Sequence, residues 1–275
     1  MITAHPEKKE YDASCLVDFL HCPKLFEYRW VRRLYPIELA APLLFGQLFH
    51  ESLLIWYKEH DIEKAVRVLD KLPTQIGDSR RTKERGEVYL RDYIKRYESE
   101  PYKIKEMEVE FHLDMGEGRT YRGRMDMIVE WNGQLYPKDH KTSASLGLSF
   151  FRMFRPNVQK NGYCYACREL CGQCSGMIIN GISVADNPKE RFQRDISNIT
   201  GREIDEFPSQ FGQWCVFIEA CFKSQVWPKY YTQCNQYGQC NYWELCVYGE
   251  DEKTLKDKFE VRKEDEGKVV SDGDG

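Results

Sequence analysis

Three consecutive segments rich in β-branched and aromatic residues constrain the fold of this chain more than any other feature. They run over residues 107–114, 120–131 and 133–141. Residues 116–118 and 132–133 lie between them and contain glycine, which is typical of the turns that join antiparallel strands. The sequence therefore predicts a three-stranded meander in the middle of the chain.

Helical patterns flank this meander on both sides. Before it, apolar residues recur at helical spacing and no segment is typical of a strand. After it, we expect a helix, two more strands and a long helix. The elements expected outside the meander are 14–22, 24–33, 43–60, 80–98, 158–170, 177–184, 191–197 and 204–224. This order predicts an α/β fold in which helices flank a mixed sheet.

The second and third expected strands carry two carboxylates and one ammonium that can share a face. Side chains at i and i+2 of a strand point the same way, so Asp139 and Lys141 project together, and the neighbouring strand can bring Asp126 beside them. Neighbouring carboxylates repel, and a bound divalent cation such as Mg²⁺ relieves this cost. The combination suits metal-assisted phosphodiester hydrolysis. Pro137 lacks an N–H, so we expect a bulge there or strand pairing that begins after it.

Further residues in a fixed order extend the pattern. Residues 45–51 read Phe-Gly-Gln-Leu-Phe-His-Glu and contain His50, and residues 159–163 read Gln-Lys-Asn-Gly-Tyr at the start of an expected helix. Together with Glu110 and the Asp and Lys residues of the meander, this order resembles the RecB-type branch of the PD-(D/E)xK nuclease superfamily over residues 14–246. The resemblance implies a restriction-endonuclease-like core and a metal-dependent nuclease that acts on DNA.

The resemblance also implies a set of metal ligands. They are the side chains of His50, Asp126 and Asp139 and the main-chain carbonyl of His140, and the metal is Mg²⁺ or Mn²⁺. Lys141 would lie near the attacking water and stabilise the charge that develops on the phosphate.

Three further positions take supporting roles in the family. The acidic residue before the second strand is expected to be Glu110, although Glu108 shares its strand face and is the alternative. Gln159 and Tyr163 lie four residues apart and so face the same way from their helix. In the family such a pair orders the site and contacts the nucleic acid.

Four of the eleven cysteines suggest a second metal centre. Cys22 lies early in the chain, and Cys234, Cys240 and Cys246 follow late at equal intervals. The layout resembles the iron–sulfur exonuclease branch of the family, which includes AddB-like and CRISPR-adaptation nucleases, and implies a [4Fe-4S] cluster. The family separates two of its late cysteines by only two residues, whereas both gaps here are wider. Zn²⁺, which also accepts four thiolates, therefore remains the alternative.

A second group of cysteines has a different pattern. Cys164, Cys167 and Cys171 lie at i, i+3 and i+7, which is the apolar stripe of a helix, and Cys174 follows. Free cysteine behaves as a small buried hydrophobic residue. We therefore expect this group to pack in the core rather than to bind zinc.

Composition and charge are compatible with this function. The chain has 275 residues, 41% of them hydrophobic, and a net charge of −4. Ten acidic and six basic residues lie from Gly249 onward, so the rest of the chain is neutral and can bind DNA through local basic patches. No signal peptide or membrane-spanning run is evident, and an odd number of cysteines fits a reducing compartment. These features predict a cytoplasmic protein that does not interact with membranes.

The domain boundaries follow from these motifs. We expect one nuclease domain over residues 1–248, followed by a polar, mobile tail over 249–275. Within the domain, a helical region spans 12–105, the catalytic core 106–225 and the C-terminal cluster region 226–248.

The sequence thus predicts a DNA nuclease, and more specifically an exonuclease. It would act on single-stranded or duplex ends in recombination, repair or phage DNA metabolism, as an oligomer or with partner proteins from those pathways. The alternative from a different class is a non-catalytic DNA-binding or assembly module whose iron–sulfur cluster is structural or senses redox state. Asp126, Asp139 and Lys141 are all present, which favours the enzyme.

Overall fold

The computed structural model describes residues 9–38, 40–74, 77–236 and 238–262. The chain forms two compact units, each assembled from separate stretches of sequence. Among the described residues, unit 1 contains 9–38, 112–123, 208–236 and 238–262, and unit 2 contains 40–74, 77–111 and 124–207. The single nuclease domain expected from the sequence stays a prediction.

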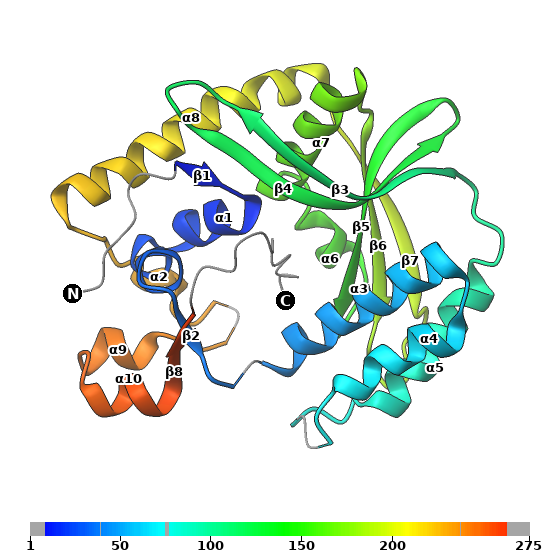
Figure 1. Ribbon diagram of the computed structural model, residues 1–275, viewed down its shortest axis with the longest axis horizontal. Helices are drawn as coiled ribbons and strands as arrows, with labels where there is room; N and C mark the ends of the chain where they lie inside the picture. Colours follow the sequence, from blue (N-terminus) through cyan, green and yellow to red (C-terminus); the bar gives the residue numbers. More distant parts are fainter. Residues whose placement is uncertain (1–8, 39, 75–76, 237, 263–275) are drawn as a thin grey trace. The chain divides into compact units, whose positions relative to one another are not determined.

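A mixed β-sheet forms the centre of unit 2 (Figure 1). Its strands are β3 (Lys103–Asp114), β4 (Thr120–Trp131), β5 (Gln134–Ser143), β6 (Gly176–Ser183) and β7 (Phe192–Asn198), in that spatial order, with β3 and β4 extending into unit 1. β4 and β5 are antiparallel, β5 and β6 are parallel, and β6 and β7 are antiparallel. The three segments of the predicted meander are β3, β4 and β5.

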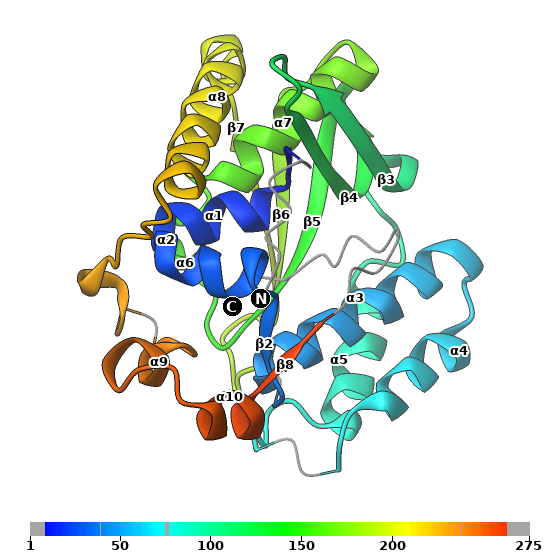
Figure 2. The same ribbon diagram turned by 60° about the vertical axis from the view of Figure 1, so that its left-hand side comes forward.

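Helices cover both faces of this sheet (Figure 2). On one face, α3 (Ala41–Glu59), α4 (Ile62–Arg67), a 3₁₀ turn (Val68–Lys71) and α5 (Lys83–Arg96) form one hydrophobic core with β4 and β6. On the other face, α7 (Val158–Cys171) packs against β5 and β6, after the short α6 (Leu148–Arg152). Unit 2 is therefore a mixed sheet flanked by helices, as the sequence predicts. Within the described ranges, no helix has the length and apolar character needed to cross a membrane.

Unit 1 contains mostly short elements. It includes β1 (Glu10–Tyr11), α1 (Ala13–His21), α2 (Pro23–Phe26), a π-helix (Glu27–Val31), β2 (Leu34–Pro36), a 3₁₀ turn (Tyr231–Gln233), α9 (Trp243–Val247), α10 (Glu252–Lys258) and β8 (Phe259–Val261). The long helix α8 (Gly201–Ser224) enters the unit at Pro208. β1 pairs with the start of β4, and β2 pairs with β8. A small core joins the early and late stretches through Tyr28, Leu34, Tyr242, Leu245 and Phe259.

The structure differs from the sequence-based prediction in several local features. β1 and β2 lie in the region expected to contain no strand, because two or three residues are too few to show strand periodicity. The first helix begins at Ala13, one residue before the expected start, and Asp12 caps it by accepting a hydrogen bond from the Cys15 N–H. β5 already pairs with β4 from Gln134 through Pro137 in continuous register, and only its pairing with β6 begins after Pro137, so the strand does not start pairing after the proline as expected.

The expected tail also differs over its first part. Residues 252–261 form α10 and β8 instead of a mobile segment. Leu255 and Phe259 pack against the core of unit 1, and this apolar contact compensates for the polar composition of the segment. The rest of the tail, residues 263–275, lies outside the described residues.

Candidate active site

The candidate site lies in unit 2, where the ladder between β4 and β5 opens. The last residue pair of the ladder is Met127 with Lys138. Beyond this pair, the N–H of His140 bonds to a side chain instead of the backbone of β4. It donates a hydrogen bond of 3.0 Å to Oδ2 of Asp126. The strand register thus places the Asp126 carboxylate beside the backbone of β5.

His50 reaches this carboxylate from α3. Its Nδ1 lies 3.4 Å from Asp126 Oδ2. Burial alone would raise the pKa of Asp126, but the charge and hydrogen bond of His50 and the N–H of His140 outweigh it and hold this pKa below its usual range. Burial opposes the charge of His50, and Asp126 overcomes that effect, so the pKa of His50 is raised. The two residues therefore stabilise each other's charged forms.

Asp139 and Lys141 share the next part of β5. The Lys141 Nζ lies 3.1 Å from Asp139 Oδ2, and both residues are buried. Even so, the geometry does not make a hydrogen bond, and Asp139 Oδ2 has no hydrogen-bond partner among the described residues. Burial raises the pKa of Asp139 to about 6, the positive charge of Lys141 opposes this rise, and the negative charge of Asp126 adds to it. This carboxylate is thus under-satisfied, and a nearby cation would stabilise its ionised form.

These residues fit a hard divalent cation, although the side chains are not arranged around one. In the part of the chain that the structure describes, no group of three His, Cys, Asp or Glu side chains is in position to hold a metal ion. The donors are nevertheless two carboxylates from adjacent strands and one imidazole, and Asp139 Oδ2 is buried with an ion pair to Lys141 but no hydrogen-bond partner among the described residues. Oxygen-rich sites of this kind suit Mg²⁺ and Mn²⁺.

Glu108, not Glu110, lies close to this group. Glu110 is exposed on β3. Glu108 adopts a left-handed backbone conformation with φ of 53°, which interrupts the alternation of the strand, and it forms an ion pair of 2.7 Å with Arg124. Burial raises the pKa of Glu108, Arg124 opposes the rise, and the charge of Asp126 adds to it. A residue held in such a conformation is a common feature of functional sites.

Sequence reasoning gave Arg124 no role, although it lies two residues before Asp126. Arg124 carries a charge opposite to that of the glutamates on the preceding strand. This charge complementarity is the sequence feature that indicates its ion pair with Glu108.

Tyr163 joins α7 to β4 beside these residues. Its hydroxyl donates a hydrogen bond of 2.9 Å to the main-chain oxygen of Arg124, and its ring contacts Phe111 edge-on. Gln159 lies one turn earlier on the same helix and is half-buried. The structure thus brings Tyr163 to the strand that carries Asp126.

The four cysteines of the expected cluster line one cavity in unit 1. The cavity has a volume of about 230 Å³, and Cys22, Cys234, Cys240 and Cys246 all contribute to its wall. The main-chain N–H of Tyr230 donates a hydrogen bond of 3.5 Å to the sulfur of Cys22. Burial raises the pKa of the Cys240 thiol to about 11 and also raises that of Cys246.

Four thiols around one cavity fit a thiolate-bound centre, because metal binding displaces thiol protons even where burial holds them tightly. The described sulfurs are not themselves in a metal-binding arrangement. The choice between iron–sulfur and zinc therefore stays a prediction.

Two of the four cysteines in the second group pack in the core as expected. Cys164 and Cys167 are fully buried on α7, whereas Cys171 is exposed. Gly172, with φ of 78°, ends the helix and reverses the chain. Hydrogen bonds from Cys164 and Cys167 then lower the pKa of Cys174 to about 4.

The sequence matches a model of a known family. The model for the "PD-(D/E)XK nuclease superfamily" matches residues 13–247, which is most of the chain. No protein with a curated description matches the sequence.

Two solved structures are similar to this one. The first is a crystal structure of a protein from Eubacterium rectale described as a "Putative exonuclease", with 18% sequence identity, coverage of 88% of this chain and 87% of the other, and a TM-score of 0.56. At this identity, the similarity supports the fold alone. The second, the protein SSO0001, has 17% identity over 89% of each chain and a TM-score of 0.39.

Proposed function

This chain belongs to the PD-(D/E)XK nuclease superfamily, and we propose that it is a metal-dependent nuclease that hydrolyses phosphodiester bonds in DNA. The observation that carries the proposal is the half-buried pair of Asp126 and His50 next to the buried pair of Asp139 and Lys141, at the open end of the β4–β5 ladder. We further propose that it is an exonuclease, the activity named in the description of its structural neighbour. The pathway that we propose for it is recombination, repair or phage DNA metabolism.

The ligands would be His50, Asp126, Asp139 and the main-chain carbonyl of His140. A bound Mg²⁺ or Mn²⁺ would neutralise the two carboxylates, polarise the phosphate and lower the pKa of a bound water. The protein's own part is to hold these donors in place. The His140 N–H and the His50 imidazole fix Asp126, and burial keeps competing water away from Asp139.

Lys141 and Glu108 would lie next to the DNA phosphate bound at these metal ligands. Lys141 is buried with its ammonium 3.1 Å from Asp139, where its charge can stabilise a phosphate that carries extra negative charge in the transition state. We propose Glu108, instead of Glu110, as the acidic residue contributed by β3. Its ion pair with Arg124 supports this choice.

We also propose that Cys22, Cys234, Cys240 and Cys246 hold a structural [4Fe-4S] cluster, with Zn²⁺ as the alternative. The shared cavity supports a single centre for all four residues. Four thiolates are the ligand set of a cubane cluster.

DNA cleavage tests the proposed function directly. Wild-type protein with Mn²⁺ should degrade end-labelled single-stranded or duplex DNA, and excess chelator should stop it. Asp126→Asn, Asp139→Asn and Lys141→Met should each lower the rate by at least about 100-fold, because each removes charge from the reacting centre.

Asp92→Asn is the matched control for these variants, since Asp92 is an exposed carboxylate on α5. It should cleave like the wild type. Full activity in Asp139→Asn, or cleavage in excess chelator, would contradict the mechanism.

A further inference from the structure

A closed ring of buried polar side chains lies behind the catalytic strand. On β5, Lys138 and His140 point to the face opposite Asp139 and Lys141. Both are almost completely buried, with 0% and 2% of their surface exposed. They belong to a circuit of hydrogen-bonding contacts that we call the buried ring, whose members are Lys138, His140, Asn180, Arg194, Glu100 and Tyr57.

One half of the buried ring runs across the sheet from β5 to β7. Lys138 Nζ lies 3.4 Å from Nε2 of His140. Nδ1 of the same imidazole lies 2.9 Å from the side-chain amide nitrogen of Asn180 on β6. Nε of Arg194 on β7 then donates a hydrogen bond of 2.7 Å to Asn180 Oδ1.

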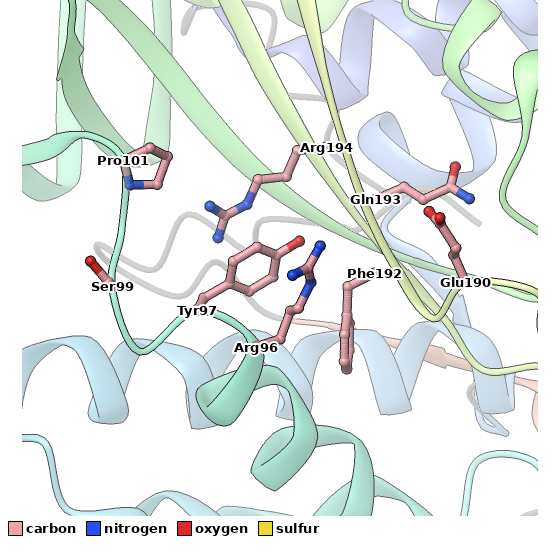
Figure 3. Close-up of a pocket in the computed structure, with 8 residues that line it drawn as sticks. All are labelled: Arg96, Tyr97, Ser99, Pro101, Glu190, Phe192, Gln193 and Arg194. Carbon is pink, nitrogen blue, oxygen red and sulfur yellow. The ribbon is translucent and has the colours of Figure 1, made fainter.

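The other half closes the ring through α3. Arg194 donates a hydrogen bond of 2.9 Å to Glu100, which also accepts one of 2.6 Å from the hydroxyl of Tyr57. Tyr57 in turn accepts a hydrogen bond of 3.2 Å from Lys138. Arg194 also lies over the aromatic ring of Tyr97 and lines a surface hollow of about 580 Å³ (Figure 3). The buried ring therefore reaches solvent at Arg194.

The chemistry of these groups sets the direction of the contacts at His140. Arginine can only donate, so Asn180 must turn its oxygen toward Arg194 and its NH₂ toward His140. Nδ1 of His140 is then the acceptor, and Nε2 carries the proton, so Nε2–H donates to Lys138 when that lysine is a neutral amine; burial lowers the pKa of Lys138 to about 7. The imidazole is thus held in one orientation by a residue on the neighbouring strand.

His140 also belongs to the candidate site through its backbone. Its N–H donates to Asp126, and its carbonyl is one of the proposed metal ligands. A buried network in which every member has a partner favours a single arrangement of the groups it joins. The side chain on one face of β5 can therefore fix the peptide groups that serve the other face.

We propose that Asn180 and Arg194 are positioning residues for the metal site, which act by locking the His140 imidazole and with it the peptide groups of β5 next to Asp126. This inference rests on the proposed function, because it requires a divalent cation at Asp126 and Asp139. Residues that orient metal ligands typically change metal affinity about 10- to 100-fold when replaced.

Mn²⁺ affinity, measured by calorimetry on the intact folded protein, tests the inference without relying on activity. Asn180→Leu removes both amide contacts at similar volume and should weaken Mn²⁺ binding by about tenfold or more. Tyr93→Phe is the matched control, because it removes the hydroxyl that bonds Tyr57 and Arg194 but keeps the aromatic ring that lies edge-on to His140. It should bind Mn²⁺ like the wild type even if its melting temperature falls.

A pair of variants at His140 decides the matter if Asn180→Leu does not fold. His140→Leu should weaken Mn²⁺ binding, whereas His140→Asn, whose amide oxygen can still accept the hydrogen bond from Asn180, should recover most of it. Equal Mn²⁺ affinity in His140→Leu, His140→Asn and Tyr93→Phe would overturn the inference and leave the proposed function intact. A wild-type protein that binds no Mn²⁺ would overturn both.

Discussion

Asp126 and Asp139 are equally typical of a metal site in the sequence, yet their surroundings differ. His50 and a backbone N–H stabilise the charge of Asp126, so its pKa is lowered. Asp139 has an oxygen without a hydrogen-bond partner, and burial raises its pKa to about 6. The Asp–x–Lys spacing predicts that the two strands bring carboxylates together. It does not predict which one carries the unsatisfied charge, because this depends on contacts with a distant helix.

The pKa of Asp139 predicts a pH-dependent effect of metal on stability. A carboxyl whose pKa is raised on folding stabilises the folded state fully below its unfolded pKa of 3.8, and this contribution is lost as the pH rises through about 6. A divalent cation binds the ionised form and offsets the loss. Mn²⁺ should therefore raise the melting temperature more at about pH 7.5 than at about pH 5. An equal rise at both pH values in the wild type, or a pH-dependent rise in Asp139→Asn, would contradict this assignment.

The two glutamates of β3 provide a matched test of the third acidic residue. Glu108→Gln should lower DNA cleavage by about tenfold or more, because it removes a charge beside Asp126 and leaves Arg124 without its ion pair. Glu110→Gln, two residues away on the exposed side, should cleave at the wild-type rate. The opposite order would restore Glu110 as the residue that contributes to the site.

At the scale of elements, periodicity predicted the long helices and strands well, because their buried faces repeat over several turns or residue pairs. Periodicity does not indicate local changes in backbone conformation. Regular alternation gives Glu108 and Glu110 the same face, and only the left-handed conformation at Glu108 separates them. β2 and β8 form through pairing between residues far apart in the sequence, so neither has a local signal.

The contact between α7 and β4 predicts a moderate effect of Tyr163→Phe. This change removes one hydrogen bond to the Arg124 carbonyl, which is worth about 0.5–1.5 kcal/mol, so cleavage should fall by no more than about tenfold. Gln159→Ala should have an effect of similar size. Tyr165→Phe, on the same helix, is the control and should be neutral. If Tyr163→Phe lowered the cleavage rate as much as Asp126→Asn does, Tyr163 would take part in the reaction more directly.

At the scale of the whole molecule, the two candidate centres lie in different units. The carboxylate site is built within unit 2, and the four cysteines line a cavity within unit 1. Unit 1 is assembled from stretches at both ends of the chain, and Cys22 comes from the first whereas the other three come from the last. A metal centre there would join these stretches and contribute folding free energy.

Metal content tests this role of the cysteines. If Cys22, Cys234, Cys240 and Cys246 hold a [4Fe-4S] cluster, anaerobically purified protein should be brown and contain about four irons per chain. Serine at any of the four positions should remove the iron and lower the melting temperature, because the link between the two stretches is lost. Cys171→Ser is the control, since this cysteine is exposed and lies in unit 2. One zinc per chain in colourless protein would replace the cluster with a zinc site.

Asp126, Asp139 and His50 should together bind one divalent cation. Crystals grown with Mn²⁺ and measured at a wavelength where manganese scatters anomalously would test it most directly. We expect an anomalous peak within about 2.5 Å of oxygen atoms of both Asp126 and Asp139, and no such peak in crystals of Asp139→Asn. A wild-type crystal without manganese at this position, from protein that cleaves DNA with Mn²⁺ in solution, would contradict it.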